Sequence, residues 1–248
     1  ELGRLQAVGR PTEVAVQLLL QHQLQHLPFL KAMWVLDTDG RMVHSSESGN
    51  LGTSLADRDY FQVYRSRSEA GFYLSAPLRS RVVKGWVTQA ARPLRGPQGA
   101  WQGVIVAAMD PLYFDRLWGT ADVGEGGHTA LVRSDGMLMM RSPFDDALMA
   151  QQLNNPQLLG ALASVQPMGS FQQLSPEDGR MRVVAYRSLS IQPELAVAVS
   201  QTHDHLLAGW RKLAWLAVAI WALGSVVVAV LSVKLARAWQ QTALAQGH

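Results

Sequence analysis

Two arginines, Arg79 and Arg81, stand close together in a segment that separates two predicted strands. Trp86, Thr88 and Arg92 share one face of the second strand, because the side chains of a strand alternate between its faces. Guanidinium groups bind carboxylates and phosphates through paired N–H donors, and an indole offers an apolar wall. These residues therefore predict a binding site for a small anionic or zwitterionic solute. The alternative is that the arginines are solvated loop residues above a tryptophan of the core.

Motifs for catalysis and metal binding are weak in this sequence. His22 and His26 have the spacing of a zincin helix, but Gln23 stands where that motif requires a glutamate as general base. His203 and His205 are too close in sequence to share one face of a helix. No nucleophile triad, phosphate-binding loop or carboxylate pair is recognisable. We predict no catalytic residue, no metal and no cofactor for this chain.

The charged residues and the cysteine count exclude further classes of function. The 248 residues include 22 lysines and arginines and 19 aspartates and glutamates, for a formal net charge of +3. Both signs are mixed along the chain and form no basic stripe, so nucleic acid is not a predicted partner. The sequence contains no cysteine, which excludes disulfides, a thiol nucleophile and a cysteine-based zinc site.

A stretch without any charged side chain runs from Leu213 to Val233. A helix of this length crosses the ~30 Å hydrocarbon core of a bilayer. Trp215 near one end and Trp239 beyond the other suit the headgroup regions. We therefore predict a transmembrane helix over 213–233, surrounded by a lipid bilayer. Its orientation stays open, because basic residues flank both ends equally: Arg211 and Lys212 before it, Lys234 and Arg237 after it.

The residues before this stretch change from a helical to a strand-like pattern. Pro11 followed closely by Glu13 is a helix-start signal, and no breaker follows until Pro28. We therefore predict a long N-terminal helix within 1–27. From Ala32 onwards, short apolar runs bounded by Gly, Pro, Asp and Ser indicate strands.

A repeat divides the strand-rich part of the chain into two. Asp39-Gly40 and Asp135-Gly136 each lie between two apolar runs, which is typical of a β-hairpin. We expect type I′ turns, in which both central residues have positive φ. Further strands follow each hairpin, and Gly124 to Gly127 reads as a linker. The pattern predicts an α+β fold with two tandem PAS-like modules, each an antiparallel sheet with helices on one face. The alternative is two unrelated hairpins within one larger sheet.

These elements together resemble a known family. The resemblance is carried by the segments Asp57–Phe61, Gly71–Pro77, Trp86–Leu94, Gly103–Asp110 and Asp135-Gly136. Their order and spacing are similar to those of the double Cache (PDC-type) sensor domain of bacterial transmembrane receptors, from Pro28 to Gln201. The sensor regions of diguanylate cyclases and histidine kinases are the most similar within that family.

The resemblance implies an organisation of the chain along its length. It gives an N-terminal helix over 1–27, a membrane-distal module over 28–118, a membrane-proximal module over 119–201, an exit helix over 202–212, the transmembrane helix over 213–233 and the start of a cytoplasmic linker over 234–248. Residues 1–212 would be periplasmic, at a bacterial inner membrane, and the chain would form a homodimer. A start at Glu1 instead of methionine leads us to expect a longer protein, and the resemblance implies another transmembrane helix upstream of Glu1.

The resemblance also adds candidate ligand contacts in the membrane-distal module. Asp110 matches the position where amino-acid-binding members hold the ligand ammonium, but an aspartate before a proline is also a helix N-cap pattern. Tyr60 and Tyr73 lie in the matching segments and are further candidates, whereas large aromatic residues beside Tyr60 equally suit an α+β core. The Arg-aromatic-Tyr cluster of amino-acid binders is missing after Arg81, which disfavours an amino acid as ligand.

We therefore predict a small-molecule sensor region that passes ligand binding through the transmembrane helix to an output domain outside this sequence. Two alternatives stay open. The full-length protein would be described by its enzyme output, a diguanylate cyclase or a histidine kinase, neither of which these residues contain. Alternatively, the modules would bind another protein and no solute.

Overall fold

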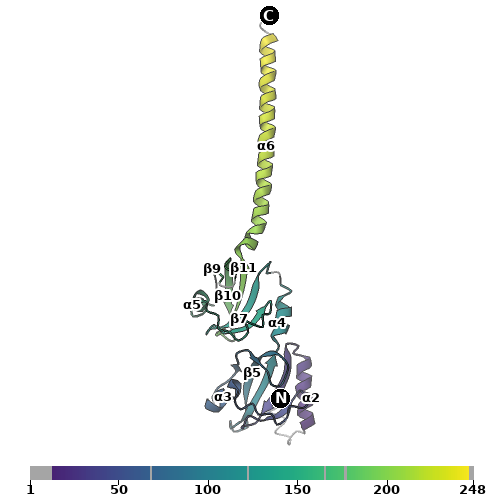
Figure 1. Ribbon diagram of the computed structural model, residues 1–248, viewed down its shortest axis with the longest axis vertical. Coiled ribbons are helices and arrows are strands. Elements are labelled where there is room, and N and C mark those ends of the chain that lie inside the picture. The colour runs from purple at the N-terminus through teal and green to yellow at the C-terminus, as the bar shows by residue number, and fades with distance from the viewer. Residues whose placement is uncertain (1–12, 68, 122, 165, 176–177, 246–248) are drawn as a thin grey trace.

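The computed structural model describes residues 13–67, 69–121, 123–164, 166–175 and 178–245. The predicted helix start at Pro11 lies outside these residues. Two antiparallel sheets with their helices are stacked one above the other, and a long helix extends from the second (Figure 1). The predicted α+β class with two sheet modules, an N-terminal helix and a C-terminal apolar helix is confirmed.

The distal module comprises the elements far from the long C-terminal helix. It contains the helices α2 (Glu13–Gln25) and α3 (Asp59–Ser66) and the strands β1 (Leu30–Leu36), β2 (Met42–Ser45), β3 (Tyr73–Leu74), β4 (Leu78–Arg79), β5 (Trp86–Arg95) and β6 (Trp101–Met109). The sheet has the order β2-β1-β6-β5-β3, and β4 pairs with β5 outside this path.

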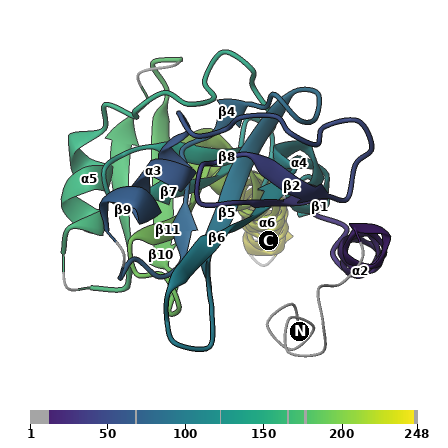
Figure 2. The same cartoon turned by 90° about the horizontal axis from the view of Figure 1, so that it is seen from below.

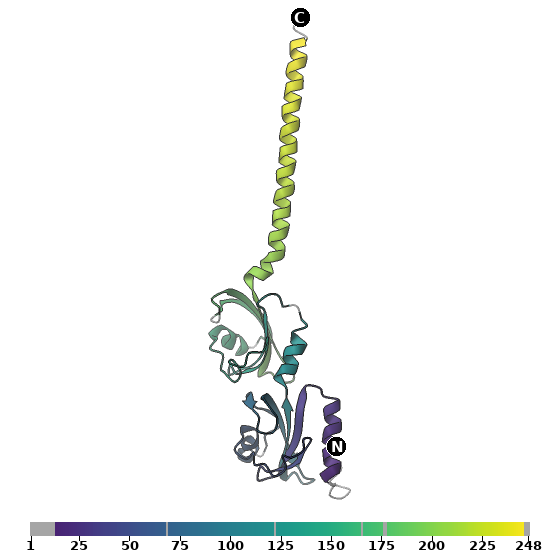
Figure 3. The same cartoon turned by 45° about the vertical axis from the view of Figure 1, so that its right-hand side comes forward.

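Helices cover both faces of the distal sheet, whereas the sequence predicted helices on one face only. α2 lies along β1 and β2 on the side opposite α3 (Figure 3). Its contact rests on Val16 and Leu20, which are buried because they recur at helical spacing on one side of α2. On the other face, Trp34, Tyr60 and Phe61 form the centre of a fully buried core between the sheet and α3.

The proximal module comprises the strands next to the long helix. It contains β7 (His128–Arg133), β8 (Leu138–Ser142), the helix α5 (Pro156–Leu162), β9 (Met168–Leu174), β10 (Met181–Ser188) and β11 (Leu195–Thr202). The strand order is β8-β7-β11-β10-β9. The helix α4 (Pro111–Trp118) connects the modules and contacts β8, where the Ser142 hydroxyl donates a 3.2 Å hydrogen bond to the Asp115 carbonyl. Seen along the long axis, α3 and α5 lie toward the same side of the molecule (Figure 2).

The two predicted hairpins are present, but the predicted type I′ turns are wrong. Gly40 and Gly136 have φ of 77° and 85°, and Ala150 is the only described residue other than glycine with positive φ. Asp39 and Asp135 therefore do not adopt the left-handed conformation that type I′ requires. Each hairpin also shifts register by one residue beside the turn. This geometry is a type I turn followed by a left-handed glycine and a bulge.

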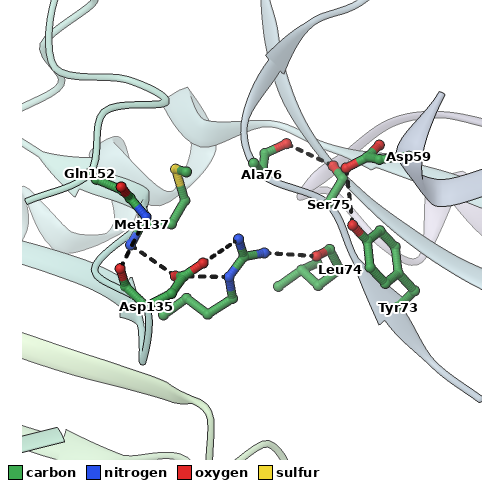
Figure 4. Close-up of polar contacts among 9 residues, drawn as sticks. Asp59, Tyr73, Leu74, Ser75, Ala76, Asp135, Met137 and Gln152 are labelled. Carbon is green, nitrogen blue, oxygen red and sulfur yellow. Dashed lines mark hydrogen bonds and ion pairs between the residues drawn. The ribbon is translucent and has the colours of Figure 1, made fainter. Parts of the chain in front are cut away.

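Apolar residues from both modules form a shared core between them. Leu74 of the distal module is buried together with Met139, Met140 and Leu195 of the proximal module. A polar contact crosses the same boundary, because the Arg133 guanidinium bonds to the Asp135 carboxylate and donates to the Leu74 carbonyl at 3.4 Å (Figure 4). The two modules therefore pack directly against each other.

The C-terminal helix α6 (His203–Ala245) is continuous over 43 residues, or about 65 Å. The predicted exit helix and transmembrane helix are thus parts of one helix, which begins at His203. The most apolar 18 residues within His203–Lys234 have a mean hydropathy of 2.5 and are not buried by the rest of the chain. The helix is long and apolar enough to cross a membrane.

Candidate ligand-binding sites

Arg79 and Trp86 lie side by side at the boundary between the modules. They are paired across β4 and β5, and the Arg79 guanidinium lies 5.1 Å from the centre of the indole ring. Both side chains bind one carboxylate, that of Asp146 in the proximal module. Arg79 Nη2 lies 2.9 Å from Asp146 Oδ2, and Trp86 Nε1 donates to Asp146 Oδ1 at 2.6 Å. The structure therefore places these two predicted site residues in an inter-module contact.

Arg81 lies in the loop after β4 and forms a bidentate ion pair with Asp57. Its two Nη atoms donate to the two carboxylate oxygens at 2.9 and 2.8 Å. The hydrogen bonds from Arg81 hold the pKa of Asp57 below its ordinary value. The Tyr73 hydroxyl donates a 3.1 Å hydrogen bond to the Asp59 carboxylate. Burial of the Tyr73 hydroxyl, and to a smaller extent the negative charge of Asp59, raises the pKa of Tyr73 to about 12. Asp59 is the first residue of α3, and Asp57 lies two residues before it.

The other two predicted site residues of β5, Thr88 and Arg92, lie in different environments. Thr88 is buried, and its hydroxyl lies 3.4 Å from the Met139 carbonyl of the proximal module. Arg92 is exposed, with its guanidinium 5.6 Å from the centre of the Phe72 ring. Thr88 thus belongs to the boundary between the modules, whereas Arg92 contacts Phe72 within the distal module.

Tyr60 and Asp110 were each predicted either to contact a ligand or to have a structural role, and both have a structural role in the fold. Tyr60 is 1% exposed within the core under α3, and burial raises its pKa. Asp110 is the N-cap of α4, since its carboxylate accepts a 3.1 Å hydrogen bond from the Leu112 backbone N–H. The same carboxylate lies 3.1 Å from Lys31 Nζ. The core and N-cap alternatives therefore describe what these side chains do in the fold.

The predicted site residues do not all meet in one place. Arg79, Trp86 and Thr88 contact the proximal module, Arg81 lies beside the start of α3, and Asp110 starts α4. His22 in α2 and His26 just after it meet edge to face, with ring centres 4.9 Å apart. Among the described residues, no group of three metal-ligating side chains is close enough to hold an ion.

A cavity in the proximal module was not foreseen from the sequence. It has a volume of about 140 Å³ and lies between the sheet and the segment that leads into α5. Arg141 and Arg182 line it, although they are only 8% and 4% exposed. The available signal was the alternation of β10, which places Arg182 on the same inward face as Val184 and Tyr186. An inward arginine between apolar residues is unusual enough to mark a site.

Two stacked sheet modules followed by an apolar helix define a class of protein, the two-module extracellular sensor domain. The sequence profile of the Cache domain family matches residues 1–210. The chain belongs to this family, and the predicted double Cache resemblance is confirmed. None of the curated proteins matches the chain at a significant level.

Solved structures of sensor domains share the fold. The extracellular domain of rpHK1S-Z16, assigned as a histidine kinase, is 31% identical with a TM-score of 0.70, covering 81% of this chain and 82% of that one. The domain of the Pseudomonas aeruginosa PAO1 amino acid chemoreceptor PctB, in complex with L-Arg, is 18% identical with a TM-score of 0.62, covering 82% and 78%. The V. cholerae histidine kinase DctB sensor domain is 16% identical with a TM-score of 0.52, covering 80% and 81%.

Proposed function

We propose that the chain is the sensory region of a bacterial inner-membrane receptor that binds a small solute outside the cytoplasm. In this proposal the two modules are periplasmic, α6 crosses the lipid bilayer, and the segment after Lys234 leads to a cytoplasmic output domain. We propose a homodimer, because two-fold dimers are the commonest form of soluble homo-oligomers. Membership of the Cache family supports the sensory role.

The observation that carries the proposal is the direct connection between the proximal sheet and the apolar helix. β11 lies between β7 and β10, and Thr202 at its end is followed at once by His203, the first residue of α6. No loop separates strand and helix, so a shift of β11 displaces the start of α6. A solute that binds one packing of the modules more tightly than another changes the populations of the two helix positions.

The predicted distal residues remain the proposed contacts for an anionic or zwitterionic solute. Arg79 and Arg81 already bind carboxylates, those of Asp146 and Asp57. A solute carboxylate would exchange with these aspartates, with Trp86 as an apolar wall. The related domains of PctB and Mlp24, which bind L-Arg and asparagine, support a solute of this size and polarity.

A histidine kinase is the output that we propose for the full-length receptor. The support is the 31% identity with the extracellular domain of rpHK1S-Z16. A diguanylate cyclase output is the alternative that the sequence resemblance leaves. In either case the solute site belongs to the modules, and the catalytic residues belong to the output domain.

The proposal is tested with the full chain in lipid nanodiscs. Thermal unfolding is recorded against a panel of amino acids, dicarboxylates and monocarboxylates. A true ligand at about 100 times its dissociation constant should add about 2.7 kcal/mol to the stability of the modules. If no solute in a broad panel shifts the transition and a protein partner does, the solute-sensor function is contradicted in favour of a protein-binding module.

The orientation is tested in intact cells by single cysteines, since the chain has none of its own. Cysteines at Ser48 and Ser170, which are both exposed, should react with a membrane-impermeant maleimide. A cysteine at Ala245 should react only after the membrane is opened. The reverse pattern would contradict the periplasmic assignment of the modules.

A further inference from the structure

The cavity of the proximal module is lined by apolar and by polar side chains. The apolar lining includes Val132, Leu138, Leu158, Val184 and Ala198, from four strands and α5. The polar lining consists of His128, Arg141, Asn154, Asn155, Gln173, Ser175, Arg182 and Ser200. A small ligand with both a polar group and an apolar body matches such a lining.

Arg182 is the most informative polar residue of the lining. Its Nη1 donates to the Gly126 carbonyl at 2.6 Å and lies 3.1 Å from His128 Nδ1. Its Nη2 donates to the Asp178 carboxylate at 2.6 Å. The buried Nε–H has no hydrogen-bond acceptor among the described residues. A buried guanidinium donor of this kind favours an incoming acceptor, because an unmet donor costs free energy.

The charges that line the cavity favour an anion. Among the described residues, the lining includes the two arginines and no aspartate or glutamate. Asp178, the carboxylate partner of Arg182, lies outside the lining and is 32% exposed. An arginine binds a carboxylate through paired N–H donors.

The volume of the cavity limits the ligand to a short chain. About 140 Å³ is close to the ~150 Å³ of an apolar protein cavity that holds benzene. The described lining has no aspartate or glutamate, so the ammonium group of an amino acid would be buried there without a carboxylate partner, and the small volume disfavours the second carboxylate of a dicarboxylate. We propose that the proximal module binds a short aliphatic monocarboxylate, with its carboxylate at Arg182 and its hydrocarbon chain against Val184 and Leu158. This second site goes beyond the solute site of the distal module.

The site is connected to α6 through the loop before β7. Arg182 holds this loop at the Gly126 carbonyl, and the Thr202 hydroxyl lies 3.5 Å from the Glu125 carbonyl of the same loop. Gly124 lies so close to His205 that any side chain at this position would overlap the imidazole ring. An anion that engages Arg182 therefore acts on the segment that contacts the first turn of α6. Occupation of the cavity provides an input next to the membrane.

The proposal is tested by calorimetric titration of the full chain in nanodiscs with sodium butyrate. Butyrate should bind, whereas butyramide lacks the charge and succinate carries a second carboxylate, so both should bind at least about tenfold more weakly, a difference of about 1.4 kcal/mol. Arg182→Gln should weaken butyrate binding by about tenfold or more. Arg187→Gln is the matched control, because Arg187 is an exposed arginine of the same strand. It should leave the affinity unchanged.

A second variant keeps the test valid if Arg182→Gln impairs folding. Ala130→Leu fills the cavity from β7 without removing any polar group, and should abolish butyrate binding while thermal melts remain cooperative. Absence of butyrate binding to the unmodified chain, or binding that survives both substitutions, would overturn the proposal. Butyrate binding that is lost only in Arg79→Ala and Arg81→Ala would also overturn it, and would leave the distal solute site standing.

Discussion

The indole Nε1 of Trp86 in the distal module donates a 2.6 Å hydrogen bond to the carboxylate of Asp146 in the proximal module. Arg79 stacks on the same indole and binds the same carboxylate. The modules are thus joined at two depths, by the buried apolar core around Met139 and Met140 and by this polar contact at the surface. A movement of one module relative to the other has to rearrange the polar contact.

The contact between Trp86 and Asp146 should be measurable as a coupling energy. Asp146 is 61% exposed, so the expected coupling in a double-mutant cycle of Trp86→Phe and Asp146→Asn is modest, about 0.2–1 kcal/mol. Urea unfolding of the detergent-solubilised chain measures it. Trp101→Phe combined with Asp146→Asn is the control, because Trp101 packs on Phe61 instead. A coupling of zero for the first pair would contradict the contact.

Gly103 should tolerate no side chain. Its φ of 142° lies in the region that favours glycine, and a Cβ atom there would lie 2.0 Å from the Leu36 carbonyl oxygen in the neighbouring strand. Gly103→Ala should therefore lower the free energy of unfolding by at least about 1 kcal/mol. Gly71→Ala is the control, because open space surrounds that position and the effect should stay within about 0.5 kcal/mol. Equal effects would show that β6 does not approach β1 as described.

The ion pair of Asp178 should make stability depend on pH on the acid side. The hydrogen bond from Arg182 lowers the pKa of Asp178 below its ordinary value of 3.8. A carboxylate with a lowered folded-state pKa stabilises the fold above the unfolded-state pKa, and this contribution is lost as the pH falls through the folded-state pKa. Asp178→Asn should therefore destabilise the chain at neutral pH, with a difference from the unmodified chain that shrinks below pH 3.8.

Melting temperatures of both proteins between neutral and strongly acidic pH check this prediction. Asp204→Asn is the control, since Asp204 is 84% exposed and should change the melting temperature little at any pH. A constant difference between Asp178→Asn and the unmodified chain across the whole pH range would contradict a stabilising carboxylate at Asp178.

Arg79 and Arg81 can be tested as ligand contacts separately from their ion pairs. The side chains of both ion pairs are at least half exposed. Alanine at either arginine should therefore change the free energy of unfolding by less than about 1 kcal/mol. If a solute carboxylate binds there, the same substitutions should weaken its binding by about 1.5–3 kcal/mol. Calorimetric titration beside thermal melts separates the two effects, with Arg187→Ala as control. Unchanged affinity for a confirmed distal ligand would remove both arginines from the site.

Much of the fold was predictable because its signals are local. The short apolar runs indicated further strands after each hairpin, where β5, β6, β10 and β11 lie, and the two Asp-Gly pairs marked both hairpins. The predicted turn type was wrong because a turn with one left-handed glycine and a bulge connects the two strands of a hairpin as well as a turn with two left-handed residues does. Asp37 reinforces the observed turn, since its carboxylate accepts from the backbone N–H groups of Asp39 and Arg41.

The sites were less predictable because they depend on contacts between distant segments. Nothing near Arg79 in the sequence indicates that Asp146 is its partner. The burial of Arg182 likewise depends on the Gly126 carbonyl, which comes from a loop before β7. Helical spacing and strand alternation describe which face a residue occupies, and they do not describe which element covers that face.

The central claim is that a bound solute moves α6, and a distance measurement across the junction tests it most directly. Spin labels on cysteines at Gln172 in β9 and Gly209 in α6, both exposed positions, report the distance between the proximal sheet and the helix. Double electron–electron resonance is recorded in nanodiscs with a solute whose saturation is verified by calorimetry, and with a compound that does not bind as control. The account predicts that the saturating solute changes the populations of the distance distribution and the control does not. Identical distributions at verified saturation would contradict the transmission of binding through α6.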